Sequence, residues 1–178
     1  ATADGINGNR LTTSISAEVL GVRCADGSVR RSNRIPIMAP ATAALVVGVL
    51  LGVVVWFFGR LAGLDRDRAY YATILAVVAL YYALFAVMGG SVEALLQESV
   101  AIVGFFVLTA LGFRRSPWIV AAGLAGHGLY DCVHGYLISN PGMPVWWPYF
   151  CGSIDVTMAA GMAWILLRQE SPKDAAPG

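Results

Sequence analysis

The chain has 178 residues, of which 57% are hydrophobic and 13% are charged, and its net charge is +1. Soluble domains carry about 25% charged residues, so this composition excludes an ordinary water-soluble domain. The basic residues are few and scattered at loops, which excludes a nucleic-acid-binding surface. The three cysteines form no Cys-x-x-Cys pair, so neither a disulfide framework nor a zinc knuckle is indicated.

Residues 1–37 differ from the rest of the chain because they are polar and show no sustained periodicity. We expect them to form a flexible N-terminal extension. Met38 stands directly before the first apolar run, and position 1 is Ala1. One hypothesis is therefore that the native chain begins at Met38, which mass spectrometry of the native N-terminus tests.

Five apolar runs follow, at about residues 39–58, 69–88, 92–113, 118–138 and 145–167. A membrane-spanning helix needs about 20 residues to cross a hydrocarbon core of roughly 30 Å. We therefore predict an all-α integral membrane bundle of about five transmembrane helices over residues 38–168, followed by a polar tail at 169–178. All five Trp residues fall near the ends of these runs, where their rings favour the membrane interface. Gly48 and Gly52 have the spacing of a close helix contact, which we expect to be made within the chain.

Basic residues also predict an orientation. The connections after the first and third runs and the tail contain arginine or lysine, whereas the turns after the second and fourth runs contain none. The positive-inside rule then places the N-terminus outside and the C-terminus inside, in a multi-pass protein of the bacterial inner membrane. The basic residues before the first run oppose this orientation if residues 1–37 are native.

The apolar runs contain acidic residues and both histidines of the chain, but no Lys or Arg. A charged carboxylate near the bilayer centre costs a few kcal/mol, so these groups need protonation, a histidine partner, water or a cation. His127, Asp131 and His134 lie on one face of the fourth helix because of their i, i+4, i+7 spacing. At 1.5 Å per residue, Glu98, Asp131 and Asp155 fall within roughly 5 Å of one level. We expect a polar chamber among the third, fourth and fifth helices, nearer the turns without arginine.

A metal site is one interpretation of this chamber. Asp131 forms chelating i, i+4 and i, i+3 pairs with His127 and His134, and Glu98 or Asp155 would complete the ligand set. The two histidines are about 10 Å apart along the helix, which favours two metals or one ligand with one supporting residue. The nitrogen and oxygen ligands suit zinc, iron or manganese. Asp131, Asp155 and Glu98 are also the candidate catalytic residues, since a carboxylate that binds no metal would act as general base.

Three other interpretations remain open. The polar groups could form a hydrogen-bonded network that specifies helix packing. They could also relay protons or cations, although the inner ends of the helices contain no such groups. The chain could instead be an accessory subunit that binds another membrane protein through its glycine-lined faces. In each case the lipid bilayer is a partner, and for an enzyme we expect a lipid-like substrate. Cys132 and Cys151 are expected to be small apolar fillers.

A sequence pattern between Gly126 and Asp155 connects these residues. It comprises His-Gly-Leu-Tyr-Asp at 127–131, His134, Trp-Pro at 147–148, Phe-Cys at 150–151 and Asp155. This stretch resembles an uncharacterised family of small bacterial multi-pass membrane proteins. The resemblance implies that these positions act together, and it implies no particular activity.

Overall fold

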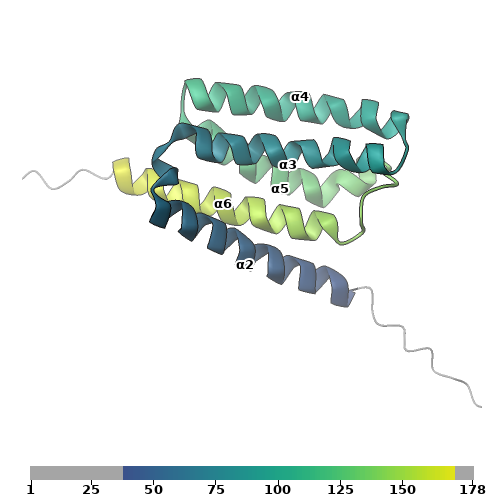
Figure 1. The fold of residues 1–178 in the computed structure, drawn as a ribbon, viewed down its shortest axis with the longest axis horizontal. Coiled ribbons are helices and arrows are strands. Elements are labelled where there is room, and N and C mark those ends of the chain that lie inside the picture. Colours follow the sequence, from purple (N-terminus) through teal and green to yellow (C-terminus); the bar gives the residue numbers. More distant parts are fainter. Residues whose placement is uncertain (1–37, 171–178) are drawn as a thin grey trace, which may run out of the picture. The chain divides into compact units, whose positions relative to one another are not determined.

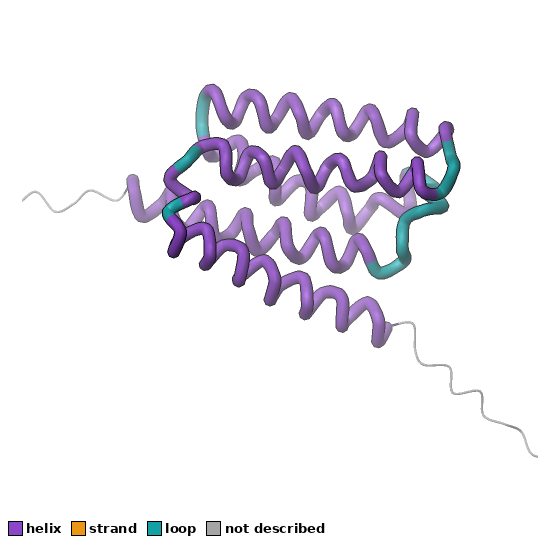
Figure 2. Tube along the Cα trace, viewed as in Figure 1, coloured by secondary structure: helices purple, strands orange, loops and turns teal. Residues whose placement is uncertain are grey.

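The computed structural model describes residues 38–170. The predicted N-terminal extension and residues 171–178 of the predicted tail lie outside the described residues. Within them the chain forms long helices joined by short connections, with no strand (Figures 1 and 2). The helices are α2 (Met38–Ala62), α3 (Arg68–Met88), α4 (Val92–Arg114), α5 (Pro117–Leu137) and α6 (Trp147–Glu170), and a 3-10 turn, η1 (Leu64–Arg66), follows α2. The predicted all-α bundle is confirmed.

Local chemistry explains where several of these helices begin. Asp67, Ser91 and Ser116 are the N-caps of α3, α4 and α5, and each side chain accepts a hydrogen bond from a backbone N–H of the first turn. Pro117 follows at the first position of α5, where its missing N–H costs nothing. Gly90 has a φ of 66°, which permits the tight turn that makes α3 and α4 antiparallel neighbours.

Four of the described helices are long and apolar enough to cross a membrane, namely Pro40–Ala62, Arg68–Met88, Val92–Arg114 and Trp147–Gln169. Within the most apolar stretches of α2 and α4, only 11% of the residues are buried, so their apolar side chains face outward. Such a surface requires a bilayer, and the chain is a multi-pass integral membrane protein. The fifth predicted span, α5, has 21 residues and contains both histidines and Asp131, and it is not among these four.

The helices pack in pairs around α5 and α6. Helix α6 contacts α2 on one side and α5 on the other, while α3 packs against α4 and both contact α5 (Figure 1). A Cβ atom on Gly48 would lie 2.4 Å from the Phe150 carbonyl oxygen, and one on Gly52 would lie 2.9 Å from Cβ of Thr157. The expectation that Gly48 and Gly52 make a contact within the chain is therefore confirmed.

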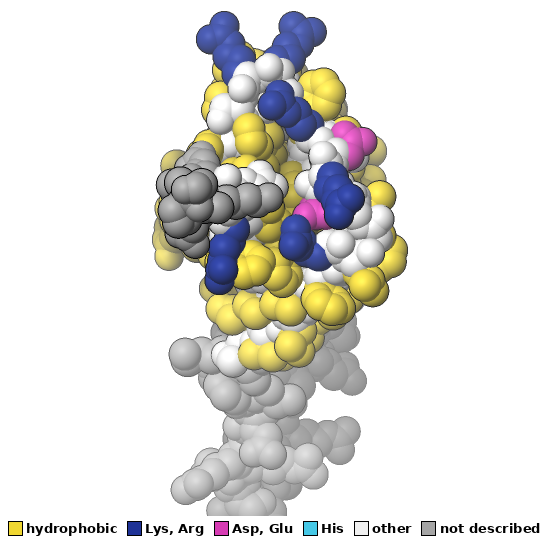
Figure 3. All heavy atoms as spheres, turned by 90° about the vertical axis from the view of Figure 1, so that its left-hand side faces the viewer, with side chains coloured by type: hydrophobic (Ala, Val, Ile, Leu, Met, Phe, Trp, Pro, Cys, Tyr) yellow, Lys and Arg dark blue, Asp and Glu magenta, His cyan; other side chains and the backbone are white. Residues whose placement is uncertain are grey.

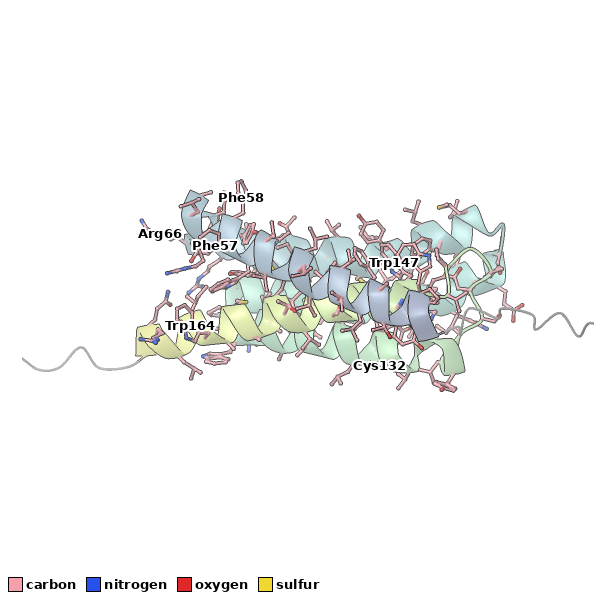
Figure 4. The ribbon with its side chains drawn as sticks, turned by 90° about the horizontal axis from the view of Figure 1, so that it is seen from below. Phe57, Phe58, Arg66, Cys132, Trp147 and Trp164 are labelled. Carbon is pink, nitrogen blue, oxygen red and sulfur yellow. The ribbon has the colours of Figure 1, made fainter. Side chains whose placement is uncertain are left out.

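The two ends of the bundle differ in charge. The described basic side chains, Arg60, Arg66, Arg68, Arg114, Arg115 and Arg168, lie at the helix ends that Figure 3 faces. Figure 4 shows Trp164 near this end and Trp147 toward the opposite end. The helix ends opposite the arginines contain the 89–91 turn and the 138–146 loop, neither of which has a basic residue.

Candidate metal centre

Polar side chains are concentrated inside the bundle. Those buried among residues 40–169 are Glu98, His127, Asp131, His134, Asn140 and Asp155, each at most 9% exposed. They occupy the middle of the bundle and the half away from the arginines. The other half has a core of apolar and aromatic side chains, including Leu75, Val120, Leu124, Met162 and Ile165.

Four side chains from α5 and α6 form one compact group, which we call the α5–α6 cluster: His127, Asp131, Cys151 and Asp155. One potential ligand atom from each lies within 4.8 Å of the others, and all four residues are buried. His127 Nδ1 is 2.7 Å from Asp155 Oδ2 and 3.8 Å from Asp131 Oδ2. The Cys151 thiol donates to Asp155 Oδ2 over 3.7 Å.

Helical spacing and two glycines explain how this cluster forms. His127 with Asp131, and Cys151 with Asp155, are i, i+4 pairs, so each helix presents two donors on one face. A Cβ atom on Gly152 would lie 3.1 Å from the Gly128 carbonyl oxygen and 3.2 Å from Asp131 Oδ2. Glycine at these positions therefore lets α5 and α6 approach closely enough for their donors to meet.

The cluster contains buried polar atoms without a hydrogen-bond partner. Within the described part of the chain these are His127 Nε2, Asp131 Oδ2 and Asp155 Oδ1. An unpaired buried polar group costs about 1–3 kcal/mol, and more when it is charged. A bound cation would compensate two ionised carboxylates at this depth, where the spans offer no Lys or Arg.

The geometry suits a tetrahedral metal. Zinc bonds of about 2.0–2.3 Å place neighbouring ligand atoms about 3.3–3.8 Å apart. The separation of 3.7 Å between Cys151 Sγ and Asp155 Oδ2 lies in this range, while the group as a whole is wider, with its ligand atoms within 4.8 Å of one another. The 2.7 Å contact between His127 and Asp155 is a hydrogen bond, which would open by less than ~1 Å to admit a metal.

A second buried group lies beside the cluster and consists of Glu98, His134 and Asn140; we call it the Glu98 group. His134 Nε2 is 2.7 Å from Glu98 Oε1, and the Asn140 amide donates to the same oxygen over 3.0 Å. Asn140 also donates to the Tyr82 carbonyl oxygen over 3.0 Å. These bonds tie the 138–146 loop to α3 and α4 and occupy Glu98 Oε1, while the Tyr130 hydroxyl donates to Oε2 over 3.4 Å.

Tyr82 of α3 connects the two groups. Its hydroxyl donates to Asp131 Oδ1, and its ring stacks on His134 with centroids 4.2 Å apart. Tyr82 is 2% exposed, so this bridge is shielded from lipid. It fixes the orientation of Asp131, whose Oδ2 lies 3.8 Å from His127 Nδ1 and has no hydrogen-bond partner among the described residues.

The predicted chamber is thus divided. Of the five predicted metal ligands, the structure brings His127, Asp131 and Asp155 together, whereas Glu98 and His134 form a separate pair. Cys151, expected to be an apolar filler, belongs to the cluster. Its i, i+4 spacing to Asp155 was the sequence feature that could have identified it. Tyr82 and Asn140 also were not predicted, because no sequence spacing links them to Asp131 or Glu98.

A cavity of about 770 Å³ adjoins the cluster. Its walls come from α2, α5, the 138–146 loop and α6, and they include Leu45, Val49, Asp131, Asn140 and Val156. Asp131 is the member of the α5–α6 cluster that lines this cavity. A small molecule in the cavity would therefore meet the cluster at Asp131.

The fold and the site define a class: a multi-pass helical membrane protein with a buried group of histidine, carboxylate and thiol side chains. Comparison of the chain with family models, with curated proteins and with solved structures gave no match.

Proposed function

We propose that this protein is an intramembrane metal-dependent hydrolase that acts on a lipid-like substrate. The observation that carries the proposal is the buried α5–α6 cluster, whose four donors converge beside a cavity. Imidazole, thiolate and carboxylate together are a common ligand set of zinc. The thiolate makes manganese less suitable, while iron accepts the same donors. Zinc is therefore the metal that the site favours.

The residues of the cluster divide into two roles. His127, Cys151 and Asp155 would hold the metal, because three protein ligands and one open position are typical of catalytic zinc sites. When bound, zinc would polarise a substrate carbonyl and activate water. Asp131 lines the cavity, and its Oδ2 has no hydrogen-bond partner among the described residues, so it would act as general base. Of the other two predicted catalytic residues, Asp155 is a metal ligand in this proposal, and Glu98 supports His134 and Asn140.

These groups account for every bond and proton in the hydrolysis of an acyl ester or amide. The oxygen of the attacking water bonds to the acyl carbon, and the bond from that carbon to the leaving oxygen or nitrogen breaks. The proton released by the water passes to Asp131 and from there to the leaving atom. No oxidant or reductant is needed.

The contacts of the described residues favour this proposal over the alternatives. A network that only specified packing should pair its buried polar atoms. Among residues 40–169, three atoms of the α5–α6 cluster have no hydrogen-bond partner, and neither do His134 Nδ1 and Asn140 Oδ1 of the Glu98 group. A proton conduit should continue across the bilayer, but the half near the arginines is packed with apolar and aromatic side chains.

Chelation tests the proposed function. Purified protein in detergent is incubated with fluorogenic acyl esters and amides, and the release of product is followed. We expect hydrolysis that a chelator abolishes and that added zinc restores. Hydrolysis that survives complete metal removal, measured on the same sample, would contradict the proposal.

We further propose that the arginine-bearing end faces the cytoplasm of a bacterial inner membrane, which places the C-terminus inside. The positive-inside rule supports this orientation, since six described arginines gather at one end (Figure 3). An epitope added after residue 178 should be protected from protease in intact spheroplasts and accessible after lysis. Digestion of the epitope in intact spheroplasts would reverse the orientation.

A further inference from the structure

The cavity beside Asp131 is bordered by side chains that are exposed on the outer surface of the bundle. Three residues of its wall, Leu129, Tyr136 and Val145, are 67%, 90% and 83% exposed. They belong to α5 and to the 138–146 loop of a protein whose exposed helix surfaces are apolar. A molecule can therefore reach the cavity sideways from the lipid, at the depth of the half without arginines.

Three polar side chains of the cavity wall are already satisfied by their own helix. Ser153 donates to the Phe150 carbonyl oxygen, and Thr157 donates to the Ser153 carbonyl oxygen, at 2.9 and 2.7 Å. The Cys132 thiol lies 3.5 Å from the Gly128 carbonyl oxygen. These residues consequently present their carbon atoms to the cavity, which makes the wall mainly apolar.

Two residues of the wall keep a buried acceptor without a partner among the described residues, Asp131 Oδ2 and Asn140 Oδ1. Their side chains are 2% and 9% exposed. The amide nitrogen of Asn140 already donates to the Tyr82 carbonyl oxygen and to Glu98 Oε1. A ligand that satisfies both residues must supply hydrogen-bond donors.

Volume limits the ligand further. At about 30 Å³ for each water-sized group, a cavity of about 770 Å³ holds roughly 25 such groups. This size fits one long acyl chain with a small polar end. Apolar burial gives the ligand no advantage over the surrounding lipid, because lipid tails are as apolar as the cavity wall. Discrimination must therefore come from the polar groups of the wall, of which Asp131 Oδ2 and Asn140 Oδ1 are the buried acceptors without a partner among the described residues.

We infer that the cavity binds a single-chain lipid whose polar end donates hydrogen bonds, as the hydroxyl groups of a monoacylglycerol do. This inference rests on the proposed function and deepens it, because it names the class of substrate presented to Asp131. The acyl chain lies against α2 and α6, and the donating end meets Asp131 and Asn140.

A photoactivatable probe tests this inference. Monoacylglycerol with a diazirine in its acyl chain is added to the protein in lipid nanodiscs, irradiated, and the labelled residues are mapped by mass spectrometry. We expect labels on cavity residues such as Leu45, Val49 and Tyr149. Unlabelled monoacylglycerol should compete at least tenfold better than the methyl ester of the same fatty acid, which has no donor. Equal competition would overturn the inference.

Two glycines of α5 provide a matched pair of variants. A Cβ atom at Gly135 or at Gly126 would meet no atom within 4 Å, but only Gly135 lines the cavity. Gly135→Leu should fill the cavity and reduce labelling of its wall about tenfold, whereas Gly126→Leu should label like the wild type. Both variants should elute as monodisperse protein. Wild-type labelling of a folded Gly135→Leu variant would contradict the proposed binding site.

Metal content measured on the same samples separates this inference from the proposed function. Specific labelling of a protein that contains no metal would support the lipid site and refute the metal-dependent hydrolase. Stoichiometric metal without specific labelling would support the metal centre and overturn the lipid site.

Discussion

Asp131→Asn is expected to lower acyl hydrolysis by at least ~100-fold without loss of bound metal, because general bases typically contribute factors of 10²–10⁴. The substitution keeps the shape of the side chain, and an amide oxygen can still accept the hydrogen bond from Tyr82. The substitution replaces Oδ2 with an amide nitrogen, which cannot accept a proton from water at the cavity wall. Steady-state hydrolysis and elemental analysis on one preparation check both parts of this expectation.

Glu98→Gln is the matched control for Asp131→Asn. It also neutralises a buried carboxylate, and its amide oxygen can still accept from His134 and Asn140. Because Glu98 lies outside the α5–α6 cluster, we expect the hydrolysis rate of the Glu98→Gln variant to remain within a few-fold of the wild-type rate. Equal losses in the two variants would mean that the effect is a general consequence of changing buried charge, and Asp131 would lose its role as the base.

Metal removal is expected to destabilise the wild-type protein substantially. A ligand at 100 times its dissociation constant stabilises the folded state by about 2.7 kcal/mol, provided that it does not bind the unfolded state. For a domain of this length such a change corresponds to a melting-temperature shift of roughly 5–10 °C. Thermal unfolding in detergent, with and without chelator, measures the shift.

The two histidines of α5 allow the stability measurement to test which of them binds the metal. His127→Gln removes a proposed ligand, so its melting temperature should not respond to the chelator. His134→Gln changes the histidine that bonds Glu98, so we expect its melting temperature to differ from that of the wild type, but its chelator-dependent shift should persist. A shift that disappears in both variants or persists in both would contradict the assignment of His127 as ligand.

The helices were predictable because the bilayer dictates their length and composition. The apolar runs located α3 and α4 to within a residue or two, since Arg68, Gly89, Gly90 and the Arg114–Pro117 segment interrupt the pattern. Helix α2 extends to Ala62, four residues beyond its predicted end at Phe58. The reason is that Gly59 and Arg60 do not break a helix, whereas Gly63, with a φ of 73°, does.

Depth in the bundle was predictable, but helix rotation was not. The rise of 1.5 Å per residue placed Glu98, Asp131 and Asp155 near one level. The sequence cannot give the angle at which α4 faces α5, and this angle pairs Glu98 with His134 rather than with His127. The tyrosines of α3 show the same limit. Tyr82 reaches Asp131, while its neighbour Tyr81 turns to Trp147, and only the packing of α3 distinguishes them.

Elemental analysis by mass spectrometry, on detergent-purified wild type beside His127→Gln and His134→Gln, tests the metal centre most directly. We predict about one zinc per chain in the wild type and in His134→Gln, and little or none in His127→Gln. The absence of stoichiometric metal from the wild type, or its equal retention in His127→Gln, would contradict the metal centre and leave the α5–α6 cluster as a packing network.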